Sequence, residues 1–227
     1  MNRCMIACSM IEDEINKALK EENCDIDVVM MDRGLHAEPE KLLKTLQQEI
    51  DAHQEYDEIL LCYGLCGNGT AGLKSEKATL IIPKFDDCIN MMLCTGKRRS
   101  RELVKKGIIY ATAGWTQDDE GPFQQFKHFK EIYDYDDETI ADLMDMMYGN
   151  YSHLALLDTG CFDKEAVREH FERTAEFLGL ELIEVPGTNR IIRQLIKGEY
   201  DDNFIILPPG KSLGYNDFAS FEALGIN

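Results

Sequence analysis

The residues of this sequence that could do chemistry are cysteines, of which the chain contains eight. Four of them directly follow short apolar runs that are typical of buried strands: Cys8, Cys66, Cys88 and Cys161. Three or four thiolates around one point bind zinc or an iron–sulfur cluster, so these four are the candidate metal ligands. The others lie within or beside predicted elements and are interpreted as packing residues: Cys4, Cys24, Cys62 and Cys94.

The elements that must position these cysteines follow an alternation of apolar runs and amphipathic stretches, which predicts alternating strands and helices. Strands are predicted near residues 3–7, 25–31, 58–63, 78–83, 108–112, 153–158, 181–185 and 203–207. Helices are predicted near residues 11–22, 39–52, 86–106, 137–148, 163–178 and 189–197. Most strands are unbroken apolar runs, which indicates sheets covered on both faces. The predicted fold class is α/β, with mostly parallel sheets built from repeated strand–helix units in Rossmann-like lobes.

The two ends of the chain share one order of predicted elements, which favours an internal pseudo-symmetry. We therefore expect an N-terminal α/β lobe over residues 1–114, a helical excursion over 115–152 and a C-terminal α/β lobe over 153–227. In open parallel sheets, ligands bind beyond the carboxyl ends of the strands, because the connecting loops meet there. The strand-end cysteines are thus expected to converge although they are far apart in the sequence.

A glycine-rich loop is predicted directly after the third strand, where residues 63–73 read YGLCGNGTAGL. Glycines let the backbone approach a ligand closely or adopt positive φ, and exposed amides in such a turn hold an anion. A tight structural turn would use glycine as well. The candidate cofactor-binding residues of this loop are Gly64, Gly67, Asn68, Gly69 and Thr70. The glycine spacing fits a dinucleotide-binding fingerprint only loosely.

The segment after the fourth predicted strand reads IIPKFDDCI over residues 81–89. Asp86 or Asp87 can cap the helix predicted to follow. Cys88 would then lie in the first helical turn, where the helix dipole lowers the pKa of a thiol, so we expect a ligand or a nucleophile there. His36 follows the second predicted strand at the same edge of the sheet, although a lone histidine is more often a polar loop residue.

Composition excludes several classes of function. The formal charge of −18 leaves no basic face for nucleic acid, and favours either simple solubility or a basic protein partner. The longest apolar runs, such as residues 59–63, are far too short to cross a bilayer. The amino terminus reaches Glu12 too soon for a signal peptide. We therefore expect a cytoplasmic protein with reduced thiols, without a membrane or nucleic-acid partner, and with homo-oligomerisation left open.

The segments YGLCGNGTAGL (63–73) and IPKFDDCI (82–89), with Cys8 after the opening strand, resemble the family known as domain of unknown function 1638. The segments LHAEP (35–39) and AGW (113–115) are similar to that family as well. The resemblance implies a cellular setting rather than a reaction: anaerobic bacteria and methanogens, beside corrinoid-dependent methyl transfer from methylated amines. It marks as functional the positions Cys8, His36, Cys66, Asn68, Asp87 and Cys88.

The leading hypothesis is an iron–sulfur cluster of the [4Fe–4S] type, bound by Cys8, Cys66 and Cys88, with Cys161 as a candidate fourth ligand. Asp87, His36 and Asn68 are the candidate catalytic residues, which would bind or protonate a small-molecule substrate. One alternative is a zinc–thiolate site in a methyltransferase-type enzyme, because zinc uses the same ligands. Another is a non-catalytic accessory protein whose partner is a corrinoid protein. Purely structural cysteines are the last alternative, so the sequence leaves open whether the protein is an enzyme.

Overall fold

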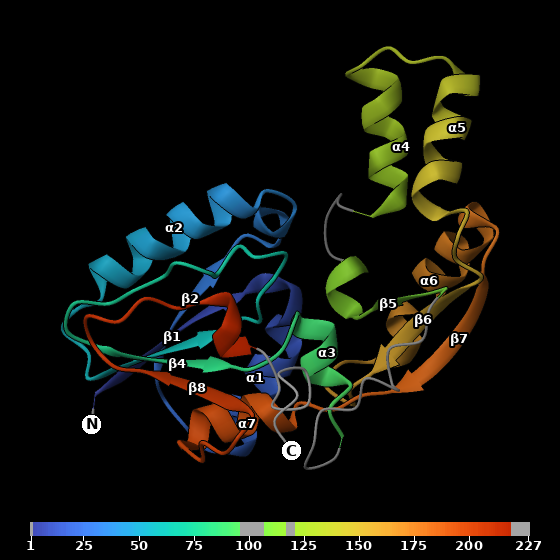
Figure 1. Cartoon of the computed structure of the whole chain (residues 1–227). Coiled ribbons are helices and arrows are strands. Elements are labelled where there is room, and N and C mark those ends of the chain that lie inside the picture. Colours follow the sequence, from blue (N-terminus) through green and yellow to red (C-terminus); the bar gives the residue numbers. More distant parts are fainter. Residues whose placement is uncertain (1, 96–106, 117–120, 219–227) are drawn as a thin grey trace. The chain divides into compact units, whose positions relative to one another are not determined.

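The computed structural model describes residues 2–95, 107–116 and 121–218 (Figure 1). The chain divides into two compact units. The first unit comprises Met1–Arg99 together with Thr188–Asn227, and the second comprises Ser100–Gly187. The chain therefore leaves the first unit after Arg99, forms the second unit and returns to the first at Thr188.

The first unit is built on a sheet whose described strands have the order β2-β1-β3-β4-β8. These strands are β1 (Arg3–Cys8), β2 (Asp27–Met31), β3 (Glu58–Cys62), β4 (Thr79–Pro83) and β8 (Phe204–Leu207). The first four run parallel, and β8 pairs antiparallel with β4. The central strands β1, β3 and β4 are buried over most of their length, which is why their sequences are unbroken apolar runs.

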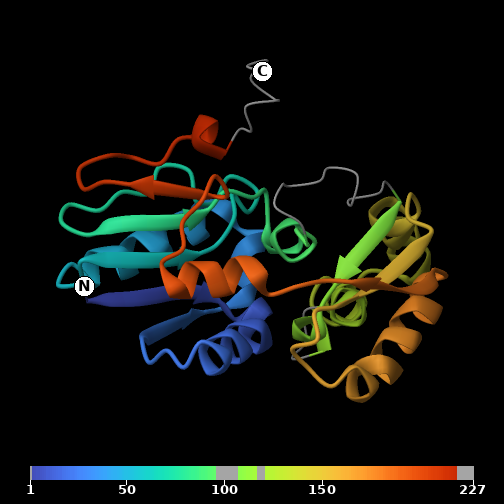
Figure 2. The same ribbon diagram turned by 90° about the horizontal axis from the view of Figure 1, so that it is seen from below.

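Helices cover both faces of this sheet (Figures 1 and 2). On one face, α1 (Glu12–Glu21) packs against α7 (Arg190–Lys197), which also contacts β3 and β4. On the other face lies α2 (Pro39–Ala52), whose inner stripe is formed by Leu42, Leu46 and Ile50 at intervals of four residues. Short helices follow the strands at the carboxyl edge: η1 (Ser9–Ile11), η2 (Arg33–Ala37) and α3 (Cys88–Met92), while η5 (Tyr215–Phe218) lies near the end of the chain.

The second unit has a parallel sheet of order β5-β6-β7 in its described part, formed by β5 (Ile108–Ala111), β6 (His153–Asp158) and β7 (Glu181–Pro186). The remaining elements are η4 (Ala113–Thr116), α4 (Pro122–Glu131), α5 (Asp137–Tyr148) and α6 (Lys164–Leu178). Its core packs Phe171 and Ala175 of α6 against Leu154 and Leu156 of β6. The helices α4 and α5 pack against each other as a hairpin (Figure 1).

The predicted α/β class with mostly parallel sheets is confirmed, and each predicted strand corresponds to a strand of the structure. The division of the chain differs from the predicted lobes. Ile205, Ile206 and Leu207 of β8 pair with β4 rather than extend the sheet of β6 and β7, because the apolar edge of β4 must be covered. Residues after 188 therefore belong to the first unit, and the predicted excursion over 115–152 lies within the second.

Two smaller differences concern helices. The helix predicted over residues 86–106 is described only as α3 (Cys88–Met92), and residues 96–106 lie outside the described part. The stretch 115–136 contains a regular helix, α4. Across the described ranges, no helix has both the length and the apolar character that a membrane crossing requires.

Candidate metal centre

The candidate site lies where the strand order of the first sheet reverses, between β1 and β3. From β1 the chain passes through α1 on one face to β2, whereas the loop after β3 packs against α2 on the other face, with Gly69 close to Leu42. Such a switch point is the usual ligand position in open α/β sheets. The register pairs Ala7 with Cys62, so Cys8 at the end of β1 and Tyr63 just after β3 are the next residues along two neighbouring strands.

Cys8 ends β1 and is buried, with an exposed fraction of 9%. Its sulfur accepts a hydrogen bond from the Met10 amide at 3.5 Å and thereby caps η1. Burial raises the pKa of the Cys8 thiol, and the Met10 amide, the Tyr63 hydroxyl and the Arg33 guanidinium each oppose that rise in pKa. The thiol is therefore neutral at physiological pH in the absence of a metal.

Cys66 lies in the glycine-rich loop in an unusual backbone conformation. Cys66, Gly67 and Asn68 all have positive φ, at 47°, 63° and 75°. A left-handed conformation costs a non-glycine residue roughly 1–2 kcal/mol, so the surrounding structure must enforce it at Cys66. The amides of Leu65 and Cys66 donate to the carbonyls of Phe85 and Asp86, both at 2.8 Å. These bonds fix Cys66 beside the segment that carries Cys88.

The glycines of this loop have packing roles. A Cβ on Gly64 would lie 2.7 Å from the Phe85 carbonyl oxygen and 2.8 Å from the Asp87 nitrogen. A Cβ on Gly69 would lie 2.6 Å from a Leu42 methyl. Thr70 is fully buried, and its hydroxyl donates to the Gly64 carbonyl at 3.0 Å. These contacts explain the residues at 64, 69 and 70 by packing, and the predicted anion-binding role of the loop stays a prediction.

Cys88 begins α3, and Asp87 caps this helix by accepting a hydrogen bond from the Asn90 amide at 2.7 Å. The prediction that Cys88 has a lowered pKa is wrong. Burial raises the pKa of the Cys88 thiol well above its usual range, and Cys66, Cys8, Asp87 and Glu14 raise it further. The described part of α3 has only five residues. Its dipole is therefore too small to offset the rise in the Cys88 pKa that the loss of hydration causes.

Electrostatic interactions link the thiols of Cys8, Cys66 and Cys88, since Cys66 and Cys8 both raise the pKa of Cys88. Their convergence on one metal stays a prediction. Burial raises the pKa of the Cys66 thiol to about 12, with Cys8 and Asp87 adding to that rise. Cys62, which we had interpreted as a core residue, joins the same group: burial raises its pKa, and both Cys8 and Cys66 contribute. We call Cys8, Cys62, Cys66 and Cys88 the cysteine cluster.

Two buried charged residues beside the cysteine cluster were missed in the sequence. Glu14, in the first turn of α1, is 1% exposed and raises the pKa of both Cys62 and Cys88. Arg33, in η2 directly after β2, is 8% exposed and lowers the pKa of Cys8. Glu14 falls on the same helical face as Ile11 and Ala18, so an acidic residue in an apolar stripe was the available signal.

The remaining predicted residues lie on a short helix and in loops. His36 is exposed on η2, with its Nδ1 atom 2.5 Å from the Arg33 carbonyl oxygen. Asn68 is exposed in the loop. Cys161 belongs to the second unit, where its thiol donates to the Thr159 carbonyl at 3.4 Å after β6. Its candidacy as a fourth ligand stays a prediction.

The side chains of the cysteine cluster are not pre-arranged around a point. Among the described residues, no three His, Cys, Asp or Glu side chains are positioned to hold one metal ion. A metal would therefore require the thiol side chains to turn toward one another.

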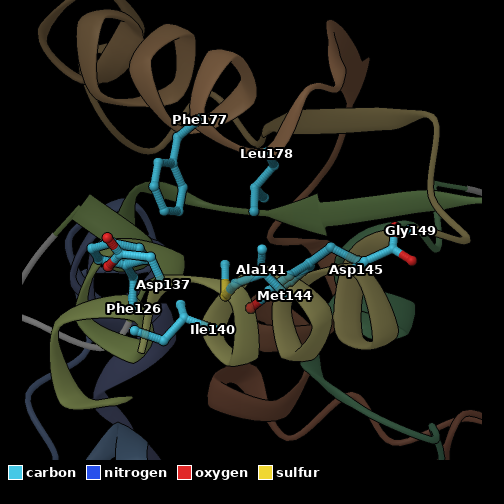
Figure 3. A pocket seen from close by; sticks show the side chains of 10 residues that line it. Phe126, Asp137, Ile140, Ala141, Met144, Asp145, Gly149, Phe177 and Leu178 are labelled. Carbon is cyan, nitrogen blue, oxygen red and sulfur yellow. The ribbon is translucent and has the colours of Figure 1, made fainter. Parts of the chain in front are cut away.

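A separate surface hollow lies in the second unit, with a volume of about 320 Å³ (Figure 3). Its lining is mainly apolar, with Phe126, Ile140, Met144 and Phe177 pointing into it. Asp137, at its rim, is already paired with Lys130 at 2.6 Å. Asp145 also lines the hollow, but neither cysteine nor histidine does, so the hollow lacks the thiols that distinguish the cysteine cluster.

Asp87 offers a direct test of whether capping alone explains this residue. Its Oδ1 atom accepts from both the amide and the side-chain nitrogen of Asn90. Asp87→Ala is expected to cost about 1 kcal/mol of folding free energy in urea unfolding, because the cap is lost. Asp87→Asn keeps an acceptor oxygen and is expected to unfold like wild type. Equal stability of Asp87→Ala and wild type would contradict the capping role.

Comparisons with known proteins give one match. No curated protein and no solved structure matches the chain. A family described as "Protein of unknown function (DUF1638)" matches residues 30–196. The matched range includes the glycine-rich loop and Cys88, and it begins after Cys8. Since the match spans well over half of the sequence, the chain belongs to the DUF1638 family.

Proposed function

We propose that the first unit binds a metal through the thiolates of Cys8, Cys66 and Cys88, and that this metal is an iron–sulfur cluster of the [4Fe–4S] type. One observation carries the proposal. The thiols of Cys8, Cys66 and Cys88 follow three different strands and interact electrostatically at the switch point of the sheet, where Cys8 is buried and the other two are partly buried. Buried cysteines that serve only packing have no reason to gather at this edge.

The chemistry of these residues supports a bound cation. Each thiol resists ionisation because its surroundings are poorly hydrated and hold other thiols and carboxylates, as the raised pKa values of Cys8, Cys66 and Cys88 reflect. A metal ion shifts each cysteine from thiol to thiolate, because the metal binds the thiolate and the proton is released. Cys62 supplies a further sulfur within the first unit.

An iron–sulfur cluster with three protein ligands would supply an open iron that acts as a Lewis acid on a substrate oxygen or nitrogen. Asp87 contributes to the raised pKa of both Cys66 and Cys88, so its carboxylate lies next to the proposed ligands. We propose that Asp87 binds or protonates a small-molecule substrate there. Asn68 and His36, both exposed on loops that follow β3 and β2, would orient the substrate.

The proposed setting is cytosolic one-carbon metabolism of anaerobes, in which corrinoid proteins transfer methyl groups from methylated amines. This setting rests on what the resemblance of the sequence motifs implies, since the matching family is described only as a protein of unknown function. A corrinoid protein is the proposed partner, and the formal charge of −18 favours one with a basic docking face. If the protein is an accessory factor, it will copurify with its corrinoid partner and show no turnover of its own.

Zinc is the second candidate for the same site, and Glu14 is the observation that favours it. This carboxylate is 1% exposed and lies beside Cys62 and Cys88. Zinc accepts mixed sulfur and oxygen ligands, whereas iron–sulfur clusters are held mainly by thiolates. Colour separates the two, because a cluster absorbs broadly in the visible and a zinc–thiolate site is colourless.

The proposal is tested by replacing Cys66 and measuring bound metal after purification without oxygen. Cys66→Ala is expected to lose most of the iron and sulfide, or the zinc, that wild type carries. Cys4→Ala is the matched control, because Cys4 is fully buried earlier in the same strand as Cys8 and burial also raises its pKa, to about 11. Equal metal content in wild type, Cys66→Ala and Cys4→Ala, with all three folded, would refute the site.

A further inference from the structure

Tyr63 has a buried polar group that its protein neighbours do not satisfy. The residue directly follows β3 and is 3% exposed. Its hydroxyl is buried and has no hydrogen-bond partner of ordinary geometry within the described residues. Buried hydroxyls are almost always hydrogen-bonded, because an unsatisfied one keeps the full cost of its lost hydration. A phenylalanine would fill the same space without that cost, so the hydroxyl calls for another partner.

The groups that surround the Tyr63 hydroxyl belong to the cysteine cluster, so its missing hydrogen-bond partner is expected there. Tyr63 interacts electrostatically with Cys8, Cys66 and Cys62, and its hydroxyl lowers the pKa of the Cys8 thiol. The strand register places Cys8 and Tyr63 next to each other, one residue beyond the pair Ala7 and Cys62. The hydroxyl therefore lies against one of the three proposed metal ligands.

The strength of a sulfur acceptor depends on its charge. A neutral thiol is a weak acceptor, so the Cys8 thiol leaves the Tyr63 hydroxyl poorly satisfied. A thiolate carries negative charge and accepts a much stronger hydrogen bond. The Cys8 sulfur already accepts from the Met10 amide at 3.5 Å, and a thiolate has lone pairs for a second donor. The two donors around the Cys8 sulfur therefore stabilise a Cys8 thiolate more than a neutral Cys8 thiol.

We infer that Tyr63 is a positioning residue that donates its hydroxyl hydrogen bond to the metal-bound thiolate of Cys8. The inference rests on the proposed metal site and adds a residue that neither the sequence motifs nor the family match assigns. A hydrogen bond to a ligand sulfur fixes the orientation of the ligand and withdraws electron density from it. Such bonds change the affinity for the metal and, in iron–sulfur proteins, set the reduction potential.

The test compares Tyr63→Phe with Tyr200→Phe in the full chain, with and without metal. Tyr200 is the matched control, because its hydroxyl donates to Glu58 Oε2 at 2.9 Å at the start of β3, the opposite end from Cys62. Without metal, Tyr63→Phe is expected to unfold at the wild-type temperature or above it, and Tyr200→Phe below it. With metal, Tyr63→Phe is expected to bind roughly tenfold more weakly in competition with a chelator, whereas Tyr200→Phe binds like wild type.

For a bound cluster, the reduction potential of Tyr63→Phe is expected to be more negative than that of wild type, because a hydrogen bond to sulfur stabilises the reduced state. If wild type binds metal and Tyr63→Phe matches it in affinity and, for a cluster, in potential, the inference is overturned and the proposed function stands. If folded wild type binds no metal, both are overturned. A metal-free Tyr63→Phe that unfolds as early as Tyr200→Phe also overturns the inference, because the hydroxyl would then have a structural partner.

Discussion

Gly64→Ala is expected to cost about 3 kcal/mol of folding free energy and to separate Cys66 from Cys88. The added Cβ would lie 2.7 Å from the Phe85 carbonyl oxygen, 2.8 Å from the Asp87 nitrogen and 2.9 Å from the Asp87 Cα. All three atoms belong to the backbone, so no flexible side chain can move aside. Relief requires the loop after β3 to move away from the loop after β4, against the hydrogen bonds that Leu65 and Cys66 donate.

Urea unfolding measures this cost directly, and Gly121→Ala is the matched control. Gly121 undergoes the same chemical change, but its Cβ would meet no atom within 4 Å and its φ is −75°, which alanine adopts readily. Gly121 is the N-cap of α4, where alanine is less favourable than glycine, so we expect the control to cost no more than about 1 kcal/mol. Equal stability of the two variants would show that the loops are not in close contact at Gly64.

The second large effect concerns the reactivity of the metal-free thiols. Burial raises the pKa of Cys66 from an ordinary 9.0 to about 12. At pH 8 the thiolate fraction of Cys66 is therefore lower than that of an ordinary thiol by about a thousandfold, and only the thiolate is alkylated. Iodoacetamide is expected to modify Cys66 about a thousandfold more slowly than a free cysteine peptide, as peptide mapping would measure.

The same pKa shift fixes the direction of the pH dependence. The folded protein keeps the Cys66 proton up to about pH 12, whereas the unfolded chain releases it near the ordinary value of 9.0. Metal-free protein is therefore expected to have its full stability below pH 9 and to lose stability as the pH rises from there toward 12. A Cys66 alkylation rate that levels off near pH 9 would contradict both the slow reaction and this loss.

The sequence was sufficient for the strands and for the edge at which the cysteines gather. The apolar runs at 58–63 and 78–83 predict buried strands, and they form β3 and β4. Since parallel strands end at one edge, the positions of Cys8, Cys66 and Cys88 after three strands predicted their convergence. The strands predicted from the apolar runs are found in the structure, because burial of the same apolar side chains produces both the sequence pattern and the sheet.

Features set by distant parts of the chain could not be predicted. The apolar run at 203–207 indicates a strand, but its sequence does not reveal that Leu207 pairs with Leu80 at the edge of the first sheet. The pKa of Cys88 was predicted from the local helix dipole, whereas burial and neighbouring thiols from two other strands raise it. The burial of Arg33 likewise depends on contacts that no local pattern encodes.

The proposed function requires that the thiols of Cys8, Cys66 and Cys88 are metal ligands rather than packing groups. Metal and sulfide analysis of wild-type protein purified without oxygen, with its visible absorption spectrum, tests this most directly. We expect folded, brown protein that contains iron and sulfide in equal amounts, or colourless protein with bound zinc if the second candidate holds. Folded wild-type protein that contains neither metal, even after reconstitution with iron and sulfide or with zinc, would show that these cysteines are not metal ligands.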